Sequence, residues 1–260
     1  MTSRGDARAP SIMAAINGAR RGKKDHPALP TTTDEIARTA AECYAAGADS
    51  LHLHIRDEHG AHSLDAGRYR ETLAEIKTRA PKMATQITTE SAGKYPPNAQ
   101  RKLLRELRPF WASVSLAEMF SDGDEKSAAR LYFWAAENEV RLQHILYRPA
   151  EVSRLAKLIK DGAIPAADLS VLFVLGKYAP PVDGAPEMLK PFLRARLDAD
   201  LPMSFMACAF GKNETECLLA AAAAGGDCRV GFENNLHNRD GSPAADNAER
   251  VSELVSLLRD

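Results

Sequence analysis

The sequence predicts a single-domain (β/α)8 barrel over residues 1–260, and three observations lead to this fold class. Short apolar runs alternate with longer amphipathic segments, which is typical of repeated strand–helix units. Eight such units occupy about 250 residues, with no linker or change of composition between them. The first strand is followed by Asn17-Gly18-Ala19-Arg20, which is not the glycine fingerprint expected of an open doubly wound sheet.

The first two units show the pattern most clearly. An apolar strand over 11–16 is followed by a polar, proline-rich loop and by Thr32-Thr33-Asp34-Glu35, a capping box that begins a helix through Tyr44. The second strand covers 50–57, with the sequence Ser-Leu-His-Leu-His-Ile-Arg-Asp. Apolar residues at helical spacing then predict a helix over 65–79, which Pro81 stops.

The other six units repeat this alternation to the end of the chain. The run over 169–175 is almost wholly apolar, as expected of a strand covered on both faces. The predicted strands are 82–87, 110–116, 140–147, 169–175, 203–209 and 228–232, and the predicted helices are 99–107, 126–138, 150–160, 186–197, 214–224 and 246–258.

Charge and composition favour a small-molecule enzyme. Lys plus Arg number 34 and Asp plus Glu number 35, so no positive excess predicts binding to nucleic acid or an acidic membrane. No segment reaches the roughly 18 apolar residues of a membrane span, and the polar stretch 1–8 has no apolar leader core. The cysteines, Cys43, Cys208, Cys217 and Cys228, form no C-x-x-C pair and are expected to be buried thiols. We therefore expect a cytoplasmic protein.

The second strand carries a candidate metal site. His52 and His54 are two residues apart and so point to the same face near the strand's carboxyl end. In a closed barrel the eighth strand lies next to the first and next but one to the second, so Glu233 can reach both histidines. Two imidazoles and a carboxylate would hold zinc or a related divalent ion with one position open. The alternative is that the two histidines only cap a strand.

Polar residues at other strand ends are further candidates, because these ends converge on one face of a barrel. Arg229 should point inward if Glu233 does, and an inward arginine suits a ligand with a carboxylate or phosphate. The alternative is a buried ion pair of Arg229 with Glu90 or Glu118. The other candidates are Asn17, Arg20, Thr88, Thr89, Ser91, Gln143 and Lys177.

The remaining histidines are weaker candidates. His59 and His62 flank a turn and are expected to be exposed. His144 neighbours Gln143 on a strand, so it should point outward, against a helix.

Five motifs, spread over the chain, resemble those of the β-keto acid cleavage enzymes, a family that includes 3-keto-5-aminohexanoate cleavage enzyme. They are Asn17-Gly18-Ala19, His26-Pro27-Ala28-Leu29-Pro30, His52-Leu53-His54-Ile55-Arg56, Gln86-Ile87-Thr88-Thr89 and Arg229-Val230-Gly231-Phe232-Glu233-Asn234. The resemblance implies a zinc-dependent barrel that condenses a β-keto acid with acetyl-CoA and releases acetoacetate and a new acyl-CoA. It also implies a homo-oligomer, a tetramer or a dimer.

The resemblance also implies roles for single residues. The family's metal ligands match His52, His54 and Glu233, its active-site arginine matches Arg229, and its carboxylate-holding hydroxyl residue, a serine in the family type, matches Thr88.

Two departures from the family pattern change the expected chemistry. An aspartate that acts as a proposed general base is replaced by Asn234, which cannot take a proton at neutral pH. We therefore expect Glu90 or Glu118 to be the base, and a metal-bound hydroxide is the alternative. A glutamate that contacts a substrate amino group is replaced by Arg20, so an acidic or neutral keto acid is expected.

Other functions remain open from the sequence. The same barrel would suit a metal-dependent hydrolase or aldolase, in which Glu90 or Glu118 activates a bound water. A metal-binding barrel without catalysis is the non-enzyme alternative, supported only by Asn234. The basic stretch 21–24 would meet the phosphates of CoA or simply be solvated.

Overall fold

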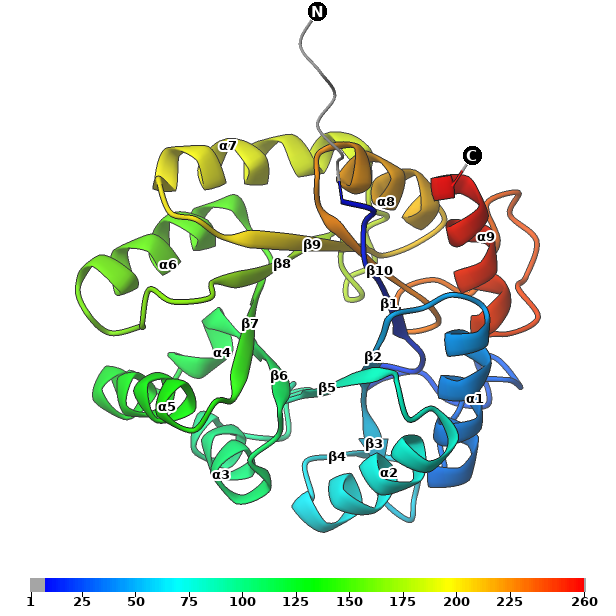
Figure 1. Cartoon of the computed structure of the whole chain (residues 1–260), viewed down its shortest axis with the longest axis horizontal. Coiled ribbons are helices and arrows are strands. Elements are labelled where there is room, and N and C mark those ends of the chain that lie inside the picture. Colours follow the sequence, from blue (N-terminus) through cyan, green and yellow to red (C-terminus); the bar gives the residue numbers. More distant parts are fainter. Residues whose placement is uncertain (1–7, 260) are drawn as a thin grey trace, which may run out of the picture.

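The structure is a computed structural model that describes residues 8–259, and in this range eight parallel strands close into a barrel (Figure 1). Their order around the barrel is β1-β10-β9-β8-β7-β6-β5-β2, as predicted for a (β/α)8 fold. The barrel strands are β1 (Ile12–Ala15), β2 (Ser50–Leu53), β5 (Ala84–Thr88), β6 (Trp111–Ser115), β7 (Arg141–Leu146), β8 (Ser170–Leu175), β9 (Ser204–Ala209) and β10 (Asp227–Val230).

Helices surround the barrel on the outside (Figure 1). The first begins with the predicted capping box, in which Thr32 accepts from the Glu35 amide and the Glu35 side chain accepts from the Thr32 amide. The helices are α1 (Thr33–Ala45), α2 (Ala66–Arg79), α3 (Pro97–Leu107), α4 (Leu116–Met119), α5 (Glu125–Glu137), α6 (Pro149–Lys160), α7 (Leu189–Ala199), α8 (Glu214–Ala223) and α9 (Asn247–Arg259).

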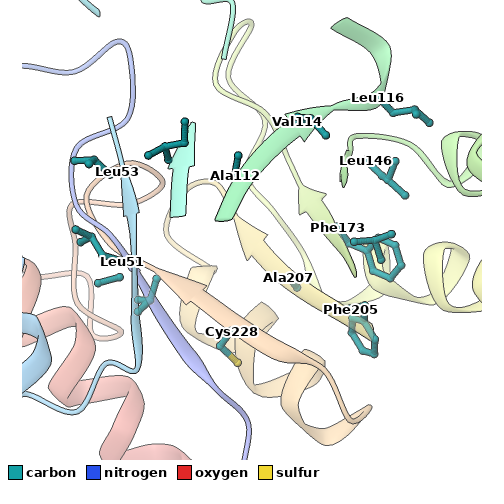
Figure 2. Packing of buried hydrophobic residues seen from close by; sticks show 14 of the residues in the cluster. Leu51, Leu53, Ala112, Val114, Leu116, Leu146, Phe173, Phe205, Ala207 and Cys228 are labelled. Carbon is teal, nitrogen blue, oxygen red and sulfur yellow. The ribbon is translucent and has the colours of Figure 1, made fainter. Parts of the chain in front are cut away.

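Alternating strand residues divide the core into two layers. Outward residues such as Leu51, Phe173 and Phe205 join one large cluster against the helices (Figure 2). Inward residues on β1 and on β7 to β9 form a small separate cluster inside the barrel: Met13, Ile145, Leu172, Val174, Met206 and Cys208. The inward positions of β2, β5 and β10 are polar, so one half of the barrel interior is available for chemistry.

Three predicted elements differ from the structure. The strand predicted over 50–57 ends at Leu53, and β3 (Ile55–Arg56) then turns away to pair with β4 (His62–Ser63) in an antiparallel hairpin. Because of this hairpin His62 is buried, so its predicted exposure was wrong, whereas His59 is exposed as expected. A short helix, α4, follows β6, and helix 186–197 begins as a single 3-10 turn, η1 (Pro186–Met188).

The remaining structural predictions concern surface and burial. All four cysteines are free and buried, as predicted. Among the described residues no helix is long and apolar enough to cross a membrane. The polar N-terminal stretch lies largely outside the described residues, as does residue 260 of the predicted domain.

Candidate active site

Three adjacent strands bring the predicted metal ligands together. His52 lies in β2 and His54 follows that strand, whereas Glu233 follows β10. Between them β1 pairs Ala15 with His52 and Ala14 with Val230. The Glu233 amide donates to the Ala15 carbonyl at 3.0 Å, which fixes the chain after β10 against β1.

The three side chains have the spacing of a metal site. The Nε2 atoms of His52 and His54 are 3.1 Å apart, and Glu233 Oε2 lies 3.6 and 3.7 Å from them. Two ligands about 2.1 Å from a tetrahedral ion lie about 3.4 Å from one another. Glu233 Oε2 is buried and has no hydrogen-bond partner among the described residues. The donor set therefore fits a divalent ion.

The ionisation states also suit a metal. Burial lowers the pKa of His52 to about 4 and the pKa of His54 well below its usual value, so both imidazoles are neutral at pH 7. Burial opposes ionisation of Glu233, but the Arg229 guanidinium and the two imidazoles hold the pKa of this carboxyl well below its ordinary range. Two neutral nitrogens and one carboxylate are thus available as ligands.

Two glycines allow Glu233 to take this position. A Cβ on Gly231 would lie 2.5 Å from the Ala15 carbonyl oxygen, and the residue has a φ of +141°. Gly18 has a φ of +62°, and a Cβ there would lie 2.6 Å from Glu233 Cγ. Any larger residue at either position would push against the backbone or the ligand itself.

Arg229 points into the barrel, as predicted, but its ion-pair partner is Glu233. Its Nη2 lies 3.2 Å from Glu233 Oε1 and 3.4 Å from Cys208 Sγ. The alternative pairing with Glu90 or Glu118 is absent among the described residues. The Arg229 Nε and Nη1 atoms are buried and have no partner there, so two nitrogens, with three N–H groups between them, remain for a bound anion.

A chain of amides lies behind His52; Gln143 was a candidate from the sequence, but the bond between Gln86 and His52 was not predicted. His52 Nδ1 lies 2.8 Å from Gln86 Oε1, which can only accept, so Nδ1 carries the proton and Nε2 is free for a metal. Gln86 Nε2 donates to Gln143 Oε1 at 3.1 Å, and Gln143 Nε2 donates to Ser170 Oγ at 3.2 Å. This chain of hydrogen bonds fixes the orientation of the Gln86 amide.

A cavity of about 380 Å³ opens beside the triad at the carboxyl ends of the strands. Eight of the residues predicted from the sequence line it: Arg20, His52, Thr88, Glu90, Glu118, Lys177, Arg229 and Glu233. Tyr147, Tyr178, Ser115 and Phe210 also line it and were not predicted. Their types are common at strand ends, so the sequence carried no signal for them.

The other predicted site residues lie outside this lining. Asn17 is buried, and its Nδ2 donates to the carbonyls of Pro30 and His54 at 3.1 Å. Thr89 Oγ1 donates to the Ser113 carbonyl at 2.9 Å. Asn234 is fully buried, and neither polar atom of its side chain has a partner among the described residues.

The two candidate bases have different surroundings. Burial, together with the Glu233 charge, raises the pKa of Glu90 to about 7. Glu90 Oε1 lies 3.5 Å from Arg20 Nη2, and Oε2 lies 3.9 Å from His54 Nε2. Glu118 Oε2 accepts from the Ser91 amide at 3.0 Å and from Gln100 Nε2 at 2.6 Å. Glu118 is therefore held by its own neighbours, whereas Glu90 faces the metal site.

The β3–β4 hairpin packs against Glu90 and His54. His62 Nε2 lies 2.8 Å from the Glu90 carbonyl oxygen, and its ring is 5.2 Å from that of His54. Arg56 is buried and donates to the carbonyls of Gly18 and Arg21. Arg56 stands directly after the metal-binding motif, but nothing in its local pattern predicts burial.

The family model of the beta-keto acid cleavage enzymes matches residues 11–260. A 3-keto-5-aminohexanoate cleavage enzyme of Acetoanaerobium sticklandii is 29% identical over 255 residues, covering 96% of this chain and 91% of that protein. A 3-oxoadipate:acetyl-CoA acetyltransferase of Cupriavidus necator is 26% identical over 261 residues, covering 96% of this chain and 88% of that protein.

A solved structure has the same fold. ObcA, in a ternary complex with a C4-CoA adduct and oxalate, superposes with a TM-score of 0.67 at 19% identity over 90% of this chain. The chain covers 64% of the length of that ObcA chain.

Proposed function

Because the chain belongs to the beta-keto acid cleavage enzyme family, we propose that it is a zinc-dependent member that condenses a β-keto acid with acetyl-CoA. The products are acetoacetate and a new acyl-CoA. The observation that carries the proposal is the His52, His54 and Glu233 triad beside a cavity that Arg229 and Glu90 also line. Another divalent ion would serve the same donor set.

The substrate carboxylate is bound by Arg229 and Thr88 in this proposal. Arg229 has two nitrogens, Nε and Nη1, without a partner among the described residues. Thr88 Oγ1 accepts from the Glu90 amide at 3.0 Å, so its own proton is free to be donated to a carboxylate oxygen. When bound, a divalent ion held by the triad supplies Lewis-acid charge that lowers the cost of removing a proton from C2 of the keto acid.

Glu90 takes the C2 proton. Its raised pKa suits a general base at neutral pH, and it lies beside the triad, whereas Glu118 is held by two hydrogen bonds. Asn234 has no basic group and takes no part in proton transfer.

The carbon chemistry then balances without a further reactant. C2 attacks the thioester carbonyl of acetyl-CoA, so a C–C bond forms and the CoA thiolate is displaced. The thiolate adds to the keto carbon C3, the C2–C3 bond breaks, and its electron pair takes the proton back from Glu90 at C2. Acetoacetate and the acyl-CoA of the remaining chain are released.

An acidic or neutral keto acid is the substrate class we propose. Arg20 lines the cavity next to Glu90 and would repel a cationic substrate chain. The Cupriavidus relative is named for 3-oxoadipate, which is an acidic keto acid. Lys177 adds a second cation to the lining. We also propose that the enzyme is a homo-oligomer, a tetramer or a dimer, which sedimentation would test.

The test is turnover of a panel of β-keto acids with acetyl-CoA and the zinc-loaded protein. Acetoacetate should form only with both substrates present. Product formed without acetyl-CoA would instead favour the hydrolase or aldolase alternative.

A Glu233→Gln variant tests the metal ligands. It should lose bound zinc and at least about a hundredfold in turnover, because a carboxylate ligand and its charge are removed. Glu58→Gln, at an exposed carboxylate, is the control and should keep both. Full zinc content in the Glu233→Gln variant would refute the ligand assignment.

A further inference from the structure

We propose that an apolar groove next to the cavity binds the pantetheine arm of acetyl-CoA; this inference rests on the proposed function. The groove encloses about 320 Å³ and is lined by Tyr147, Val174, Gly176, Val182, Met188 and Phe192, among others. We call it the thioester groove. It lies between the ends of β7 and β8 and the start of α7.

The thioester groove adjoins the cavity. Tyr147, Val174 and Lys177 line both. A thioester in the groove would therefore place its acyl end in the cavity, where the C2 carbon has to attack it. A separate pocket elsewhere on the surface would not give this access.

The groove lies on the side of the barrel opposite the metal ligands. The ligands stand on β2 and just after β10, on either side of β1. In the ring of eight strands β7 is four places from β1, so it lies across the barrel from the triad (Figure 1). A keto acid bound at the triad would leave this opposite wall free for the second substrate.

Exposure of the apolar walls favours an occupant that continues to the surface. Tyr147 is 43% exposed, Val182 is 40% exposed and Met188 is 36% exposed. These are three of the seven large hydrophobic residues that are exposed in the described range. A pocket for the keto acid's own side chain would enclose that chain, whereas CoA has to leave its nucleotide in solvent. Apolar walls with an open end match an arm of methylene and amide groups.

One wall of the groove is fixed by its own backbone. Lys177 and Val182 exchange two hydrogen bonds of 3.0 Å, which close the loop after β8. Gly176 permits this closure, because a Cβ there would lie 2.4 Å from the Val182 carbonyl oxygen. A preformed wall reduces the conformational entropy lost when a flexible arm binds.

The test replaces two exposed apolar groups with neutral polar ones. The double variant Val182→Asn, Met188→Gln should raise the KM for acetyl-CoA about tenfold, because apolar contacts with the arm are lost. The KM for the keto acid should stay within about twofold. The KM for S-acetylpantetheine, which lacks the nucleotide, should rise by the same factor. Calorimetric binding of CoA should weaken in parallel, which gives a readout independent of turnover.

A matched control is available on α7, the helix that follows η1. Leu197 on α7 is 70% exposed and lies outside the lining of the groove, so Leu197→Gln should change none of these values.

Four results would overturn the inference. If the KM for acetyl-CoA and the affinity for CoA are unchanged, the groove binds neither substrate; if the KM for the keto acid rises in place of that for the thioester, the groove binds the side chain of the keto acid. If the KM rises for acetyl-CoA but not for S-acetylpantetheine, the groove binds the nucleotide. If the double variant changes its oligomeric state, the groove contacts a second copy of the chain. A wild-type protein with no turnover of any keto acid refutes the proposed function instead.

Discussion

Replacing Gln86 with methionine should weaken metal binding without touching a metal ligand. Gln86 Oε1 accepts the Nδ1 proton of His52 at 2.8 Å, and this bond keeps the His52 Nε2 atom unprotonated and aimed at the site. Methionine has similar length but offers no acceptor of comparable strength. His52 is then free to rotate or to change tautomer.

The expected magnitude follows from the lost contacts. Loss of the partner that orients a metal-binding histidine costs about 10- to 100-fold in metal affinity, or about 1.4 to 2.7 kcal/mol. The substitution also leaves Gln143 Oε1 and His52 Nδ1 without partners inside the barrel. Each orphaned buried group costs about 1 to 3 kcal/mol of folding stability.

The assay is competition between the protein and a chromophoric chelator for zinc. Stability of the metal-free protein is measured separately by urea unfolding, so the two effects are not confused. Ser170→Ala is the control, since it removes the far end of the amide chain and leaves the bond between Gln86 and His52 in place. Wild-type zinc affinity in a folded Gln86→Met variant would refute the role given to Gln86.

Two further predictions follow from single contacts. Gly18→Ala should lower zinc affinity about tenfold or more, because its Cβ would lie 2.6 Å from Glu233 Cγ at a φ of +62°; Gly22→Ala, with no atom within 4 Å, should not. Equal zinc affinities of these two variants would contradict the argument. Burial lowers the pKa of His144 to about 4, so the unfolded chain binds a proton that the folded chain does not, and stability falls as the pH drops from 6.5 towards 4. His144→Phe should flatten this decline by up to about 3 kcal/mol in urea unfolding at several pH values, and parallel curves for variant and wild type would show that His144 does not cause it.

The fold was predictable because its signals are local. Apolar runs, helical spacing and the capping box at Thr32 each depend on residues within one turn or one strand, so the strand–helix alternation could be read in order. The exception is the stretch after Leu53. Its apolar alternation continues through Arg56, but the chain leaves the barrel there to pair with His62 and Ser63. Pairing with a distant segment is not encoded in strand periodicity.

The metal triad could also be predicted from the sequence. The two-residue spacing of His52 and His54 fixes their common face, and closure of the barrel places the end of β10 next but one to β2. Together these two facts bring Glu233 to the histidines before any coordinate is known.

Only the tertiary structure decided how the residues around the triad are used. It pairs Arg229 with Glu233, buries His62 beneath Glu90, and links His52 through Gln86 to Gln143. The sequence determined which side chains reach the carboxyl end of the barrel, because strand period and strand order set their direction. Which atoms meet there depends on differences of a few tenths of an ångström in the distances between residues far apart in the chain, and those distances are set by the packing of the whole barrel.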